Sequence, residues 1–125
     1  MTVVAGAWKR PPGQSRLTPM TEAAVAHVER FNAAVVTGDW SALVAGLHPD
    51  AVMTFVGPPV GPFVGRAAIA AAYAENPPTD TMSIVRVSTA GDTELVAFQW
   101  SQGGTGTMEI QRAAGQITSL LIRFD

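Results

Sequence analysis

The sequence predicts an α+β domain, in which helices pack on a mostly antiparallel β-sheet. Three observations support this. Apolar residues recur at helical spacing over 25–35. An alanine-rich run at 66–75 is followed by Asn76-Pro77-Pro78, which ends a helix. From residue 82 onward, short β-type segments alternate with turn residues. Helices that are segregated from an antiparallel sheet define the α+β class.

The first helix is amphipathic and begins at Thr18 or Thr21. Its apolar positions lie three or four residues apart and form one stripe: Val25, Val28, Phe31 and Val35. Gly38 ends this helix, because glycine adopts positive φ without a Cβ clash. Asp39 then suits the N-cap of a second, short helix that runs to about Gly46.

The first strand is expected over 50–56, with Ala51, Met53 and Phe55 on one face. The next segment, 57–65, contains three prolines and three glycines and is expected to be a stiff loop without ladder hydrogen bonds. A third helix follows over Arg66–Glu75. The remaining strands are expected at four segments: 82–88, 94–101, 107–112 and 116–124.

Composition limits the possible partners. The chain has 125 residues, of which 47% are hydrophobic and only 14% are charged, and its net charge is −2. This low charge suggests apolar surface that encloses a ligand or is covered by another chain. The weak negative charge argues against nucleic-acid and anionic-membrane binding. We expect a flexible N-terminal extension at 1–17 and a single domain at 18–125.

Cysteine is absent, which removes thiolate metal ligands and thiol nucleophiles. The two histidines, His27 and His48, have no metal-motif spacing to a carboxylate, so no metal site is predicted. No apolar run approaches the ~20 residues of a membrane helix. The first residues lack the order of a secretory signal. We therefore expect a cytoplasmic protein.

Several segments together resemble the nuclear transport factor 2-like superfamily, which includes ketosteroid isomerases, SnoaL-like polyketide cyclases and limonene-type epoxide hydrolases. The resemblance covers roughly residues 20–125 and rests on these segments: Gly38-Asp39-Trp40, His48-Pro49-Asp50-Ala51-Val52, Gly61-Pro62-Phe63-Val64-Gly65-Arg66, Gly115-Gln116-Ile117-Thr118 and Phe124-Asp125. It implies a cone-shaped, strongly curved sheet with three helices on its concave face around one apolar pocket.

The catalytic pattern of the isomerases is largely missing. Phe31 stands where those enzymes carry a tyrosine, and Phe55 or Val56 stands where they carry the general-base aspartate. Their oxyanion-site acid corresponds to Glu109 if the following turn is shorter, or to Met108 in an ungapped alignment. Ile122 replaces the last aspartate of the epoxide-hydrolase set, which therefore also fails.

Glu109 is thus the candidate catalytic acid or base, because burial in a dry pocket raises the pKa of a carboxyl group. Ketosteroid isomerase is the standard example of such a buried acid. The alternative is that Met108 and Ile110 face the core and Glu109 points to solvent or to a dimer interface. His48 is a weaker candidate for a base, and capping of carbonyl groups is its alternative role.

The predicted substrate-binding residues are large and mostly aromatic, as in most ligand pockets: Phe31, Met53, Phe55, Phe63, Tyr73 and Trp100. The resemblance implies a cofactor-free, ketosteroid-isomerase-like or SnoaL-like enzyme that transfers protons on an apolar small molecule. The alternatives are a non-catalytic binding module and a dimerisation module. Because the segment 117–124 is apolar on both faces, we expect a homodimer formed through the sheet.

Overall fold

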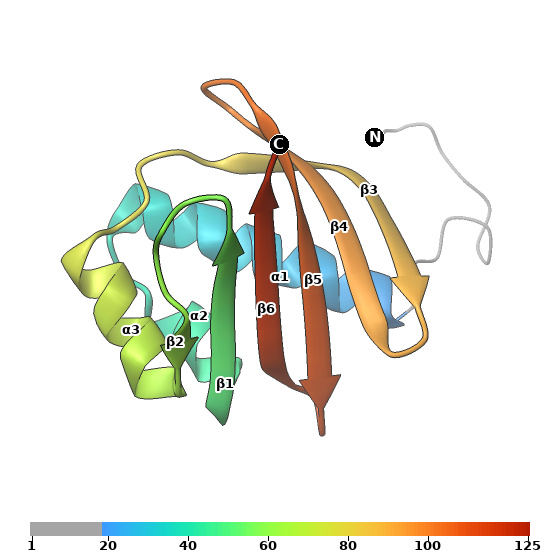
Figure 1. The fold of residues 1–125 in the computed structure, drawn as a ribbon, viewed down its shortest axis with the longest axis horizontal. Helices are drawn as coiled ribbons and strands as arrows, with labels where there is room; N and C mark the ends of the chain where they lie inside the picture. The colour runs from blue at the N-terminus through green and yellow to red at the C-terminus, as the bar shows by residue number, and fades with distance from the viewer. Residues whose placement is uncertain (1–18) are drawn as a thin grey trace.

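The computed structural model describes residues 19–125, so the predicted extension at 1–17 and the predicted domain start at residue 18 lie outside it. Three helices and six strands follow one another in the order expected for this fold (Figure 1). Their bounds are α1 Pro19–Thr37, α2 Ser41–Ala45, β1 Leu47–Val56, β2 Phe63–Val64, α3 Arg66–Glu75, β3 Met82–Ala90, β4 Thr93–Trp100, β5 Thr105–Ala113 and β6 Gln116–Phe124.

The strands form one sheet in the order β2-β1-β6-β5-β4-β3. All neighbouring pairs are antiparallel except β1 and β6, which are parallel. The helices lie against one face of this curved sheet, and α1 crosses behind the strands (Figure 1). This arrangement confirms the α+β class and the placement of the helices on the concave face.

The helix boundaries have local causes. Gly38, at φ 81°, ends α1 and donates its N–H to the Ala34 carbonyl at 2.7 Å. The Asp39 carboxylate accepts hydrogen bonds from the Ser41 N–H at 3.0 Å and from the Ser41 hydroxyl at 2.7 Å. These bonds hold the pKa of Asp39 below its usual range. The N-cap position of α2 is Trp40 and not Asp39, so the expected cap was placed one residue too early.

The proline-rich segment differs from its prediction. Two of its residues, Phe63 and Val64, form the short strand β2 and pair with Met53 and Val52 of β1. The pairing is possible because the prolines precede these two residues and leave their N–H groups free. The adjoining helix α3 begins and ends where the sequence predicts, and its Ile69 and Tyr73 are buried.

The last strand has a bulge that changes which residues face inward. The register of β5 and β6 shifts between Gln111 and Arg112, where β6 contains an extra residue. The shift lets residues 117 and 120 both face the core, although they are three apart. The outer face of β6 is therefore mixed: Ser119, Leu121 and Arg123 pair with outward-facing residues of β5. The expectation that this strand is apolar on both faces is wrong.

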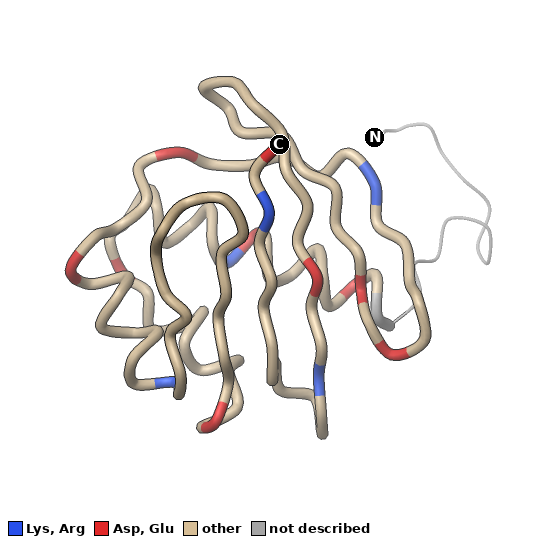
Figure 2. The backbone as a smooth tube through the Cα atoms, in the orientation of Figure 1, with Lys and Arg blue, Asp and Glu red and all other residues tan. Residues whose placement is uncertain are grey.

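Charged residues are sparse and scattered along the described backbone (Figure 2). None of the helices within residues 19–125 combines the length and hydropathy needed to cross a membrane. The same residues contain no group of three or more side chains that could hold a metal ion.

Candidate functional site

A cavity of about 270 Å³ lies between the concave face of the sheet, α1, α3 and the loop that joins α3 to β3. The strands supply most of its walls: Phe55, Phe98, Trp100, Met108, Ile122 and Phe124. Each of these side chains faces inward because alternate residues of a strand point to the same side of the sheet. The cavity is almost entirely apolar.

The aromatic walls hold one another in place. The Trp100 ring lies 6.0 Å from Phe31 and 5.1 Å from Phe98, and it stacks on Phe124 at 6.1 Å between ring centres. Phe98 also depends on Gly106 of β5, because a Cβ at that position would lie 2.7 Å from the Phe98 ring. Aromatic contacts of this kind add about 0.5–1.5 kcal/mol per pair beyond the buried area. The pocket is therefore preformed.

A second aromatic pair, Tyr73 of α3 and Trp40, packs α3 against the start of α2. Tyr73 stacks face to face on Trp40 with 4.3 Å between ring centres, and its hydroxyl donates to the Met53 sulfur at 3.4 Å. Burial raises the pKa of Tyr73 well above its usual value. Tyr73 lines the cavity as a neutral phenol whose hydroxyl proton already has an acceptor.

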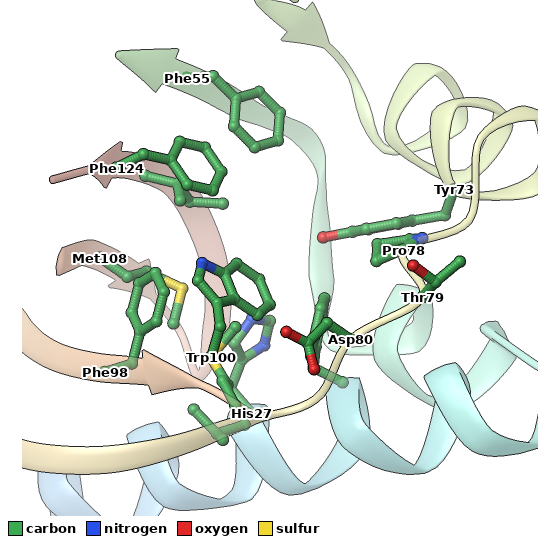
Figure 3. A pocket seen from close by; sticks show the side chains of 14 residues that line it. His27, Phe55, Tyr73, Pro78, Thr79, Asp80, Phe98, Trp100, Met108 and Phe124 are labelled. Carbon is green, nitrogen blue, oxygen red and sulfur yellow. The ribbon is translucent and has the colours of Figure 1, made fainter. Parts of the chain in front are cut away.

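His27 is the most deeply buried polar residue of the cavity. It projects from α1 and is only 3% exposed (Figure 3). Burial, with added repulsion from Arg112 and Arg30, lowers the pKa of His27 to about 4. The imidazole is therefore neutral at pH 7 and carries one N–H and one bare nitrogen. Among residues 19–125, neither ring nitrogen has a hydrogen-bond partner.

Asp80 is the carboxylate of the cavity. It lies on the loop between α3 and β3 with Pro78 and Thr79, and all three line the cavity (Figure 3). The Asp80 Oδ2 accepts a hydrogen bond from the backbone N–H of Gln102 at 3.0 Å, which fixes the carboxylate at the rim. Its second oxygen has no hydrogen-bond partner among the described residues.

Glu109 lies on the other face of the sheet. Its neighbours Met108 and Ile110 are buried on the concave side, so strand alternation turns Glu109 outward. Its carboxylate lies 3.7 Å from the Arg123 guanidinium, and both side chains are well exposed. Glu109 therefore does not border the cavity, and the geometry gives its predicted catalytic role no support.

The predicted binding residues divide between two adjacent cavities. Phe31, Phe55, Tyr73 and Trp100 border the main cavity. Met53 and Phe63 border a second hollow of about 390 Å³, which shares Phe55, Tyr73 and Pro78 with the first. His48 is outside both, and its Nδ1 accepts the Asp50 N–H at 3.0 Å, which is a turn role rather than a catalytic one.

The concave face also carries an ion pair under α1. Glu94 of β4 is fully buried, and its carboxylate accepts two hydrogen bonds from Arg112 of β5, at 2.7 and 3.2 Å. This bidentate pair borders the core beyond the cavity, on the side of His27. It satisfies the charges of both partners and leaves the cavity walls apolar.

Sequence reasoning missed His27, Asp80 and Glu94. His27 precedes Phe31 by one helical turn, so the apolar stripe of α1 already placed both residues on one face. Glu94 continues the inward alternation of Val96 and Phe98 along β4. Asp80 had no local signal, because its place depends on the path of the loop across the cavity.

The comparisons with known proteins agree with this architecture. The SnoaL-like domain family matches residues 28–119, and the chain belongs to this family. It is therefore a member of the nuclear transport factor 2-like superfamily that the sequence resembles. No curated protein matches the chain significantly.

Solved structures with the same fold have diverged far in sequence. An NTF2-like protein of unknown function from Cytophaga hutchinsonii has a TM-score of 0.69 at 12% identity, over 89% of this chain and 94% of that one. A candidate SnoaL-like polyketide cyclase from Jannaschia sp. has a TM-score of 0.66 at 16% identity, over 88% and 90%. A candidate ketosteroid isomerase from Kribbella flavida has a TM-score of 0.63 at 16% identity, over 83% and 78%. At these identities the likeness shows the fold alone.

Proposed function

We propose that this protein is a small-molecule enzyme that transfers a proton on an apolar substrate without a cofactor, as an isomerase or a cyclase does. The observation that carries the proposal is an apolar, preformed cavity that is bordered by one carboxylate, Asp80, and one neutral imidazole, His27. Apolar pockets with a few convergent polar groups are the usual form of small-molecule sites. The family, with a candidate cyclase and a candidate isomerase among similar structures, supports this reaction class.

The volume limits the substrate. A dry apolar cavity of ~150 Å³ holds one benzene molecule. By itself, the cavity of about 270 Å³ therefore suits a compound of one or two rings. A larger substrate would have to extend past Phe55 and Tyr73 into the adjoining hollow.

Asp80 is the group placed to move the proton. Its carboxylate is held at the rim by the Gln102 N–H and keeps one oxygen free to act. That oxygen would accept a proton from a carbon next to a carbonyl group, and the electron pair of the broken C–H bond would move to the carbonyl oxygen. The proton then returns to the same or another carbon, so the reaction needs no other reactant. Positioned carboxylates contribute about 10²–10⁴-fold in such steps.

Non-catalytic binding is the second candidate. It is favoured by Phe31 and Phe55, which border the cavity where the isomerases carry their tyrosine and near the place of their aspartate. A binder of apolar compounds would need the same walls and would make no use of the free oxygen of Asp80. The two candidate functions therefore differ in whether Asp80 transfers a proton.

The test is deuterium exchange at the carbon next to the carbonyl of α-tetralone, a two-ring ketone, followed by mass spectrometry in heavy water. We expect the wild-type protein to accelerate exchange over buffer and Asp80→Asn to reduce the rate by at least a hundredfold. Glu109→Gln is the matched control on the outer face and should retain the wild-type rate.

Two results would contradict the proposal. If α-tetralone binds to the wild-type protein but its deuterium exchange is no faster than in buffer, the protein is a binder and not an enzyme for this reaction. If Glu109→Gln loses the exchange activity and Asp80→Asn keeps it, Glu109 and not Asp80 is the catalytic residue. Thermal melting of each variant checks that the fold is intact.

A further inference from the structure

We propose that His27 selects ligands that carry an oxygen atom at one end of the ring system, by donating its imidazole N–H to that oxygen. This inference rests on the proposed apolar small-molecule site and names the substrate class that the site takes: one- or two-ring compounds with a single carbonyl or hydroxyl oxygen. His27 would be the residue that orients the substrate in the cavity.

The first support is the state of the imidazole. His27 is buried, borders the cavity and has no hydrogen-bond partner among residues 19–125. A buried polar group without a partner is uncommon in native proteins and usually signals an absent water, ion or ligand. The free energy lost by leaving it unpaired would be recovered when a ligand supplies the partner.

The second support is the composition of the walls. The other buried residues around the cavity are apolar except Tyr73, whose hydroxyl proton is already donated to Met53. Thr79 is exposed and Asp80 is partly exposed, whereas His27 is buried. His27 and the indole N–H of Trp100 are thus the buried or partly buried side-chain donors of the cavity without a partner within residues 19–125, and His27 is the more deeply buried of the two.

The third support is the charge around His27. Burial, with added repulsion from the guanidinium groups of Arg112 and Arg30, keeps the imidazole in the neutral form, which still carries one N–H. The repulsion from these two cationic side chains, of which Arg112 is paired with Glu94, favours a ligand oxygen that carries partial negative charge over a cation. A carbonyl oxygen, or the enolate oxygen formed when a proton leaves, fits this field best.

Asp80 lines the same cavity as His27. His27 projects from α1, and Asp80 projects from the loop between α3 and β3 (Figure 3). A ketone whose oxygen accepts the His27 N–H would have its ring carbons between these two groups. His27 would then stabilise negative charge on the oxygen while Asp80 holds the proton.

Binding can be measured without turnover, by comparing α-tetralone with tetralin, which has the same ring skeleton but no oxygen. We expect the wild-type protein to bind α-tetralone about ten- to a hundredfold more tightly, by calorimetry or by quenching of tryptophan fluorescence. In His27→Phe this preference should fall to within about threefold, while tetralin binds at least as tightly as before. Glu29→Gln, exposed on the same helix, is the control and should keep the preference.

A second measurement avoids dependence on a variant. In wild-type protein labelled with ¹⁵N-histidine, α-tetralone should shift the ring nitrogen resonances of His27 and tetralin should not. Equal binding of the two compounds, a preference that survives in His27→Phe, or unshifted His27 nitrogens with α-tetralone bound would each overturn the inference. If α-tetralone binds through His27 but no exchange occurs, only the proposed catalysis fails.

Discussion

Charged side chains are buried and paired on the concave face of the sheet but exposed on the outer face. Two residues of β5 show this difference. Arg112 points to the concave side and forms a short bidentate pair with the fully buried Glu94. Glu109 points outward and faces Arg123 at 3.7 Å in an exposed pair. The same residue types therefore have different roles on the two faces. Chemistry that needs a dry environment belongs to the concave face.

This contrast predicts a large difference between the two ion pairs. Arg112→Met leaves the Glu94 carboxylate buried without its partner, and we expect the free energy of unfolding to fall by about 3–5 kcal/mol. Arg123→Met removes the corresponding partner of Glu109, and we expect a change below about 1 kcal/mol because the pair is solvated. Urea denaturation of both variants measures the difference. Equal losses would show that the two faces do not differ in this way.

The concave face should also make stability depend on pH through His27. The pKa of its side chain is lowered from 6.5 to about 4 by burial and by Arg112 and Arg30. Between these values the unfolded chain binds one proton more than the folded chain, so stability rises with pH over this window. We expect a loss of roughly 3 kcal/mol from this group as pH falls from 6.5 to 4.

The variant His27→Phe isolates that effect. It should reduce the pH dependence of the unfolding free energy between pH 4 and 6.5. Denaturation at several pH values, compared between the two proteins, gives the slope due to His27. An identical slope in wild type and His27→Phe would contradict the burial of a neutral imidazole.

We propose the outer face as the interface of a homodimer, although its β6 residues are mixed and not apolar as expected, and this prediction has the smallest effect on the fold itself. Leu121 lies on that face beside Glu109. Light scattering should give twice the mass of one chain, and Leu121→Arg should reduce it to one chain with little change in melting temperature. Val36→Arg, at a position 79% exposed on α1, is the control. A wild-type mass of one chain would remove the dimer.

Local signals predicted the elements well. The helix α3 and the strand β6 were predicted with their observed bounds because a proline pair and a glycine turn delimit them. The short strand β2 was missed, since pairing with β1 outweighs the breaking effect of the surrounding prolines. Its formation depends on tertiary contacts that no local pattern expresses.

The site was less predictable than the fold. The alternation of residues along the strands predicts that Trp100 and Phe55 face inward, and the helical spacing of apolar residues predicts the same for Phe31. Glu109 was proposed by analogy with a family position, although its apolar neighbours already pointed to the outer face. Asp80 lines the cavity because of the path that its loop takes, and no periodic pattern in the sequence predicts that path.

The proposed function requires that apolar compounds bind in the cavity on the concave face, and methionine methyl resonances test this directly. Met82 and Met108 border the main cavity, whereas Leu95 and Leu121 lie on the outer side of the sheet. Titration of methyl-labelled protein with α-tetralone should shift the Met82 and Met108 signals in a saturable way and leave the Leu95 and Leu121 signals in place. Unchanged methionine signals, or saturable shifts confined to the two leucines, would contradict the account.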